Sequence, residues 1–323
     1  MKTQMKSISS IAQRNVPWLI LIIQVIFFSI ITDNFFTSRN ILNILNQNAF
    51  VVATALGVSL IMMSGAVDIS IGAQMSLIGV VTGTLLTQTN LPIPLTLLIA
   101  VLMGIGMNML TTILADKMNI TQFVVSIVAM NVYTGLSFVI SGGRVSDRLP
   151  DAVRMLGAGT IGPISISVII TLIFFLIMSF FLTRTYWGRY IYALGGNPEA
   201  SRLAGINVFK VRLMISAICG FFVSLGTLML IGRLGTAQST AGPGTEFLVI
   251  TGVLVGGISL RGGEGKLHGV VAGILVMSVF GNGMQLAGMG VYAQQIVRGL
   301  VMLFAIAFDF YQFNRSKKLQ KKQ

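Results

Sequence analysis

Long apolar runs constrain this chain more than any other feature of its sequence. A helix of about 20 apolar residues crosses the hydrocarbon core of a bilayer. Only 10% of the 323 residues are charged, whereas the average for soluble domains is about a quarter. The sequence therefore predicts an all-α integral membrane protein, a polytopic bundle of about ten transmembrane spans. The expected spans are approximately 16–32, 49–64, 69–88, 92–115, 122–141, 164–183, 211–232, 246–260, 268–287 and 291–313.

The basic residues predict the side of the membrane on which each loop lies. With the N-terminus in the cytoplasm, most Lys and Arg residues outside the apolar runs fall on the cytoplasmic side, as the positive-inside rule requires. We therefore expect both termini in the cytoplasm, a membrane domain over 16–313, and a basic tail at 314–323 that is attracted to anionic lipid. Residues 1–15 form a cytoplasmic arm, 184–210 a cytoplasmic loop and 142–163 an outer loop. This placement of the net charge of +13 argues against a nucleic-acid partner.

Several kinds of site are excluded by what the chain lacks. The single cysteine, Cys219, forbids an internal disulfide and has the apolar neighbours of a buried side chain. One histidine, His268, is too few for a zinc site or a relay of imidazoles. The glycine run 256–265 resembles a phosphate-binding loop, but Lys266 is followed by Leu267 where that motif needs Ser or Thr. We expect no metal and no bound nucleotide in this chain.

The 184–210 loop contains the signals of a short helix. Gly195–Gly196 supply a turn, Asn197 is a good N-cap, and Pro198 suits the first helical position. Glu199 then lies in the first turn, where the helix dipole favours a negative charge, and Gly205 ends the helix. Such a capped helix at the cytoplasmic face is either a docking element or a plain connection between spans.

A set of motifs, in order along the chain, resembles permeases of ATP-binding-cassette (ABC) importers. Glu199-Ala200, followed by Ser201 and by Gly205, resembles the loop of these permeases that docks into the ATPase subunit. Other segments resemble the ribose-type monosaccharide permeases. These segments are 34–45, 64–72, 188–190, 193–197, 204–207, 241–247 and 256–265.

The resemblance implies a non-catalytic permease subunit that carries a ribose-like pentose or a related sugar across the bacterial inner membrane. It also implies a separate ATPase that binds ATP and Mg, a periplasmic or lipid-anchored sugar-binding protein, and a second permease chain, identical or different. The residues it assigns to ATPase coupling are Asn197, Glu199, Ala200, Ser201 and Gly205. A cytoplasmic turn at Gly262, Gly263, Glu264 and Gly265 lies near the ATPase or is purely structural.

Polar residues within or between the apolar runs are candidates for the translocation path, because ionisable groups at membrane depth are costly and often functional. Asp68 either has this role or, more simply, is the N-cap of the third span. Arg298 shares a helix face with Gln294, and we expect it to face the path or to pair with Glu246. Further candidates either hydrogen-bond the sugar or join helices: Asn131, Asn282 and Gln285.

Two other classes of membrane protein remain as alternatives. A secondary transporter driven by an ion gradient needs acidic residues in its spans, and only Asp309, near the inner end of the last span, and Asp68, between spans, come into question. A membrane-embedded enzyme needs a cluster of candidate catalytic residues, and the spans offer none.

Overall fold

A computed structural model describes residues 16–320, except the side chains of Phe308 and of 311–320. The expected arm at 1–15 and the last residues of the tail, 321–323, lie outside the described residues. The described part contains thirteen α-helices and one two-stranded hairpin. In chain order they are α2 (Val16–Ile31), α3 (Ser38–Met63), α4 (Ile71–Gln88), α5 (Ile93–Met118), α6 (Gln122–Ser141), α7 (Asp151–Ala158), β1 (Thr160–Ile161), β2 (Ile164–Ser165), α8 (Ile166–Arg184), α9 (Tyr186–Gly196), α10 (Pro198–Leu203), α11 (Val208–Leu234), α12 (Thr245–Val255), α13 (Leu267–Leu286) and α14 (Val291–Gln320).

The prediction of an all-helical polytopic membrane protein is confirmed. Six helices in the described part are long and apolar enough to cross a membrane, namely α3, α5, α6, α8, α11 and α13. Shorter apolar helices are α2, α12 and the Val291–Ala307 part of α14. Each expected span has a helix in order, with α4 as the third. The side of the membrane on which the termini lie stays a prediction.

Several boundaries differ from those expected. The second span begins at Ser38, not at 49, because Thr37 caps α3 by accepting a hydrogen bond from the Asn40 N–H, and the polar turns that follow remain helical. The eighth span ends at Val255, not at 260. Gly195–Gly196, expected as a turn, are the last residues of α9. The last helix continues to Gln320, through residues expected in the tail.

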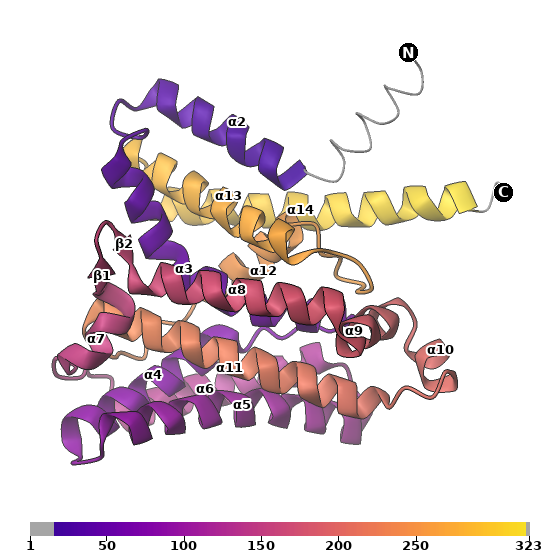
Figure 1. Cartoon of the computed structure of the whole chain (residues 1–323), viewed down its shortest axis with the longest axis horizontal. Helices are drawn as coiled ribbons and strands as arrows, with labels where there is room; N and C mark the ends of the chain where they lie inside the picture. Colours follow the sequence, from indigo (N-terminus) through magenta and orange to yellow (C-terminus); the bar gives the residue numbers. More distant parts are fainter. Residues whose placement is uncertain (1–15, 321–323) are drawn as a thin grey trace.

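The helices lie side by side around α3 and α11, which are buried along much of their length and pack against each other. Cys219 of α11 is fully buried, as expected. Figure 1 shows α7 and the hairpin at one end of the bundle and α10 at the opposite end. We call these the α7 end and the α10 end.

The short helix α12 packs flush against α13. With 11 residues it is only about 17 Å long, against about 30 Å for the hydrocarbon core of a bilayer. Gly252 of α12 and Gly256, which caps its C-terminus, face Gly273 and Gly269 of α13, and a Cβ at either α13 glycine would collide with the carbonyl oxygen of one of them. Small residues allow membrane helices to approach closely, so this seam keeps α12 close to the bundle.

Two non-helical segments bring the first turns of α4 and α12 together. Residues 64–70 join α3 to α4, and 235–244 join α11 to α12. The Gly242 N–H donates to Ser76 Oγ at 3.2 Å, and a Cβ at Gly242 would collide with the Gly72 carbonyl oxygen. Irregular backbone inside a membrane protein is tolerated where protein buries it, and these segments carry Asp68 and precede Glu246.

Candidate coupling and translocation sites

The short helix expected in the 184–210 loop is present as α10. Asn197 Oδ1 accepts a hydrogen bond from the Ala200 N–H at 3.0 Å, and Pro198 is the first helical residue. Ser201 is buried, and its Oγ donates to the Asn197 carbonyl oxygen at 2.9 Å. At the other end Gly205 has φ 83°, and the Ile206 N–H donates to the Ser201 carbonyl oxygen at 3.0 Å. This left-handed cap stops the helix after six residues.

The outer surface of α10 is exposed to solvent. Glu199 forms an ion pair with Arg202 at 3.5 Å, and both side chains are largely exposed. Leu203, at the end of the helix, is 90% exposed. A helix this short has little stability of its own, so its caps keep an acidic and an apolar side chain in place at the α10 end. This arrangement suits docking, although its partner remains a prediction.

The glycine turn expected at 262–265 is also present, between α12 and α13. Gly262, Gly263 and Gly265 have φ values of 81°, 77° and 122°, which glycine adopts readily. Glu264 is exposed. The Tyr192 hydroxyl of α9 donates to the Gly265 carbonyl oxygen at 2.9 Å, and burial raises the pKa of that phenol. The turn is therefore fastened to the helix that precedes α10.

Asp68 lies in a buried polar network rather than at the start of a helix. It is 1% exposed, and its Oδ1 accepts hydrogen bonds from the Ser70 N–H at 2.8 Å and the Ser70 hydroxyl at 2.6 Å. Its Oδ2 accepts from the Thr111 hydroxyl at 3.4 Å. The expectation that Asp68 caps the third span is wrong, because Ser70 occupies the N-cap position of α4. The carboxylate instead ties the 64–70 segment to α5.

The network continues through amide side chains that sequence analysis missed. Gln74 Nε2 donates to Ser70 Oγ at 2.8 Å, and Asn108 Nδ2 donates to Gln74 Oε1 at 2.6 Å. Both residues are fully buried. Gln74 and Asn108 could have been found from the sequence because both lie inside apolar runs, where a buried amide needs a hydrogen-bond partner. Asp68 is therefore hydrogen-bonded into a buried network that joins the 64–70 segment, α4 and α5, and its part in the translocation path stays a prediction.

A polar pocket brings several of the candidate residues together. It has a volume of about 100 Å³, and Asn282, Gln285 and Arg298 are in its wall. Gln47 and Asn48 of α3 also line the pocket. They were not among the predicted path residues, because the expected second span began only at 49. The complete lining is Ile44, Gln47, Asn48, Leu248, Met277, Ser278, Gly281, Asn282, Gln285 and Arg298.

Asn282 joins helices as well as lining this pocket. Its amide exchanges two hydrogen bonds with the Asn40 amide of α3, at 2.9 and 3.0 Å. The Asn282 side chain is thereby oriented, and its interhelical role is confirmed. Gln47, Gln285 and Arg298 of the pocket lining have exposed side chains.

Asn131 and Gln294, like Asp68 and Glu246, lie outside the pocket. Asn131 is exposed on α6, and its amide donates to the Ile127 carbonyl oxygen of the same helix at 2.9 Å. Gln294 is buried, and its amide donates to the Met289 carbonyl oxygen at 2.9 Å. It therefore does not join Arg298 in the polar wall.

The expected pairing of Glu246 with Arg298 is wrong. Ion pairs in the described part of the chain include Arg148–Asp151, Arg154–Asp151 and Arg202–Glu199, and none of these joins Glu246 to Arg298. Glu246 is buried in the first turn of α12, where its carboxylate accepts from the Gly244 N–H at 3.0 Å and lies against Gly72 in the first turn of α4. Helix N-termini are positively polarised. The N-termini of α12 and α4 therefore provide the positive potential beside the Glu246 carboxylate that an arginine was expected to provide.

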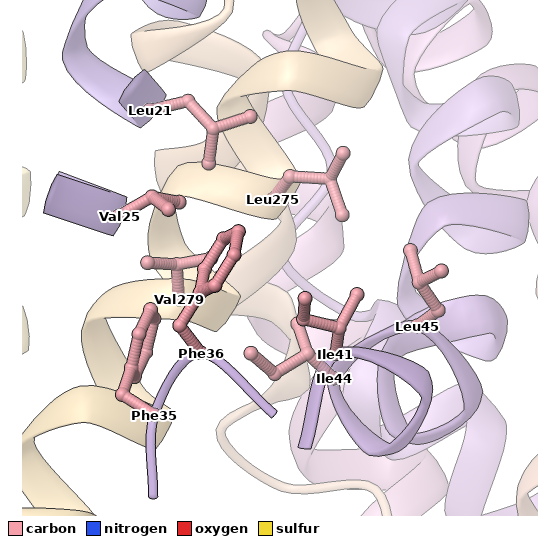
Figure 2. Close-up of a pocket in the computed structure, with 9 residues that line it drawn as sticks. All are labelled: Leu21, Val25, Phe35, Phe36, Ile41, Ile44, Leu45, Leu275 and Val279. Carbon is pink, nitrogen blue, oxygen red and sulfur yellow. The ribbon is translucent and has the colours of Figure 1, made fainter. Parts of the chain in front are cut away.

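A larger cavity is unsuited to a polar solute. It has a volume of about 270 Å³ and lies between α2, α3 and α13. Figure 2 shows that its nine labelled side chains are all apolar. They are Leu21, Val25, Phe35, Phe36, Ile41, Ile44, Leu45, Leu275 and Val279. A sugar there would lose its hydrogen bonds to water without replacement. In the described part of the chain, no cluster of three or more His, Cys, Asp or Glu side chains offers a metal site.

Comparison with known proteins gives matches over nearly the full length. Residues 40–306 match the family model described as branched-chain amino acid transport system / permease component. The chain is 34% identical to the ribose import permease protein RbsC of Haemophilus influenzae, over 93% of this chain and 94% of that protein. It is 33% identical to RbsC of Escherichia coli K12, over 90% of this chain and 91% of that protein. It is 30% identical to the galactose/methyl galactoside import permease protein MglC of Salmonella typhimurium, over 93% and 94%. No solved structure matches the chain significantly.

Proposed function

The chain belongs to the family of branched-chain amino acid transport system permease components, and we propose that it is the membrane subunit of an ABC importer for a monosaccharide. The observation that carries this proposal is its near full-length similarity to permeases named for ribose and galactose import. A permease component is a non-catalytic membrane subunit, so a separate ATPase binds ATP and Mg. A ribose-like pentose in a bacterial inner membrane is the first substrate to test.

In this proposal α10 docks into the ATPase on the cytoplasmic side. Its exposed Glu199 and Leu203 offer a charge and an apolar contact at the α10 end. The basic loop that surrounds it supports the cytoplasmic placement. The opposite, α7 end then receives the sugar-binding protein, and its cluster of Arg148, Asp151 and the partly exposed Arg154 supplies charges of both signs for that contact.

The polar pocket is the proposed section of the translocation path. Carboxamides donate and accept hydrogen bonds and a guanidinium donates several, as recognition of sugar hydroxyls requires. Gln47, Asn48, Gln285 and Arg298 supply such groups in one place. Alternating access would expose this pocket first to the binding protein and then to the cytoplasm.

A second permease chain and membrane lipid complete the assembly. The helices α2, α6 and α8 carry many exposed apolar side chains, such as Ile30, Val139 and Phe180. Exposed apolar surface of this extent marks contact with lipid or with another protein chain. The proposal leaves open whether the second permease is an identical or a sister chain.

Affinity purification of the tagged chain from native membranes tests this proposal. We expect an ATPase to co-elute with the wild-type chain and to be lost with Glu199→Lys. The matched control is Asp151→Lys, since Asp151 is also an exposed acid in the first turn of a short helix but lies at the α7 end. This control is expected to retain the ATPase.

The outcomes separate the two classes of transporter. Loss of the ATPase with Glu199→Lys alone supports both the importer and its coupling site. If the wild-type chain elutes without an ATPase in mild detergent, the proposal fails and an ion-gradient-driven secondary transporter replaces it. If both variants lose the ATPase equally, α10 is not the docking site.

A further inference from the structure

We propose that a glycine junction at the α10 end transmits the movement of the coupling helix to the helices that line the polar pocket. We define the glycine junction as Met63–Gly65, Gly195–Gly196 and Arg261–Gly263. This inference rests on the proposed function, because it assumes that α10 is moved by an ATPase. It assigns positioning roles to glycines in three segments that are distant in the sequence.

Backbone contacts backbone directly in this junction. The Gly263 N–H donates to the Met63 carbonyl oxygen at 2.8 Å. A Cβ at Gly195 would collide with both that oxygen and the Gly263 nitrogen. The end of α3, the end of α9 and the turn before α13 therefore meet at one point with no side chain between them.

A second set of contacts locks the turn in place. A Cβ at Gly262 would lie 2.7 Å from the Gly65 Cα, and a Cβ at Gly263 would lie 2.9 Å from the Gly196 Cα. Side chains can absorb a displacement by changing rotamer, whereas close-packed backbone has no such freedom. The junction is therefore a stiff connection.

On one side the junction is continuous with the coupling helix. Gly195 and Gly196 are followed directly by Asn197, the N-cap of α10. The Tyr192 hydroxyl adds a second attachment one turn earlier, through its hydrogen bond to the Gly265 carbonyl oxygen. A displacement of α10 thus reaches the turn without an intervening flexible linker.

On the other side, the four helices that line the polar pocket all meet either the junction itself or the segment 256–266, which contains Arg261–Gly263. Met63 is the last residue of α3, which carries Gln47 and Asn48 toward the pocket. α12 ends at Val255, directly before the segment 256–266, and α13 begins at Leu267, directly after it. α14, which carries Arg298, is attached where Ser259 Oγ donates to Asp309 Oδ2 at 3.3 Å. Movement of the junction would therefore change the relative positions of the pocket walls.

The test compares Gly195→Ala with Gly196→Ala in the complete importer, purified with its ATPase and reconstituted with its binding protein. The two glycines are neighbours in α9, but among the described residues a Cβ at Gly196 would have no contact within 4 Å. The probe is whichever of radiolabelled ribose, arabinose or galactose the wild type transports. The measured quantity is ATP hydrolysed per sugar imported.

We expect Gly195→Ala to retain the ATPase and to raise this ratio by about fivefold or more, the size of a typical coupling effect between sites. Gly196→Ala is expected to keep the wild-type ratio. A purely structural role would lower the yield of Gly195→Ala without moving the ratio. A wild-type ratio in folded Gly195→Ala, or loss of its ATPase, overturns the inference.

A milder variant keeps the inference testable if Gly195→Ala does not fold. Tyr192→Phe removes the bond to the Gly265 carbonyl oxygen and adds no atoms, so a raised ratio supports the junction and a wild-type ratio refutes it. Failure of the proposed function is distinguishable, because the wild-type chain would then show no ATP-driven import at all.

Discussion

At the scale of single residues, the buried acids Asp68 and Glu246 are partnered by backbone N–H groups and hydroxyls. Asp68 accepts hydrogen bonds from Ser70 and Thr111. Glu246 accepts one from the Gly244 N–H at the start of α12 and lies against Gly72 at the start of α4. Each carboxylate thereby holds a non-helical segment in place. Sequence analysis identified both acids as unusual, but their partners depend on how the helices pack and could not be predicted from spacing.

Asp68→Asn is expected to destabilise the folded protein. The amide keeps one acceptor oxygen for Ser70 but replaces the other oxygen, which accepts from Thr111, with a donor, and leaving a buried group unsatisfied costs about 1–3 kcal/mol. Thermal unfolding in detergent measures this loss. Asp147→Asn is the control, because Asp147 is exposed and its replacement should change nothing. Equal stability of both variants would show that the network does not depend on the carboxylate.

Gln285→Ala and Arg298→Gln are expected to reduce sugar uptake by about tenfold each, the effect of losing one hydrogen bond that is worth about 1.4 kcal/mol. Both residues line the polar pocket. Asn131→Ala serves as the control, since Asn131 is exposed on α6, outside the pocket, and its amide donates to the Ile127 carbonyl oxygen of the same helix. Uptake by proteoliposomes that contain the complete importer measures the effect. If the pocket variants transport like Asn131→Ala, the path lies elsewhere.

At the scale of elements, apolar runs predicted nearly every helix in the membrane domain but not the irregular ones. α3 was expected too late because its first turns are rich in Asn, and those side chains find partners such as Asn282 only in the fold. α9 was missed because Gly195–Gly196 suggested a turn, whereas the close approach of Met63 requires glycine within that helix. The caps of α10 were predictable because they are local.

The seam between α12 and α13 gives a prediction at this scale. Gly273→Val would push side-chain atoms into the backbone of α12 at Gly252, and such overpacking costs about 1–3 kcal/mol. We expect a lower melting temperature in detergent. Gly106→Val is the control, because among the described residues a Cβ at Gly106 of α5 has no contact within 4 Å. A melting temperature for Gly273→Val as high as that of the control would contradict the close seam.

At the scale of the whole molecule, the two proposed sites lie in different parts of one bundle. α10 lies at one end of the molecule, and the polar pocket lies between α3, α12, α13 and α14. The family could be predicted from motifs spread along the chain. The convergence of the pocket helices on the segment 256–266 could not be predicted, because it depends on contacts between segments far apart in the sequence.

The energy source for transport decides whether the chain is a subunit of an ABC importer. Complexes purified from native membranes with the tagged wild-type chain are reconstituted with the binding protein, and uptake of labelled ribose, arabinose and galactose is measured. We predict uptake of at least one sugar that requires ATP hydrolysis and is unchanged when ion gradients are collapsed. Uptake that proceeds without ATP and follows a proton or sodium gradient would contradict the claim.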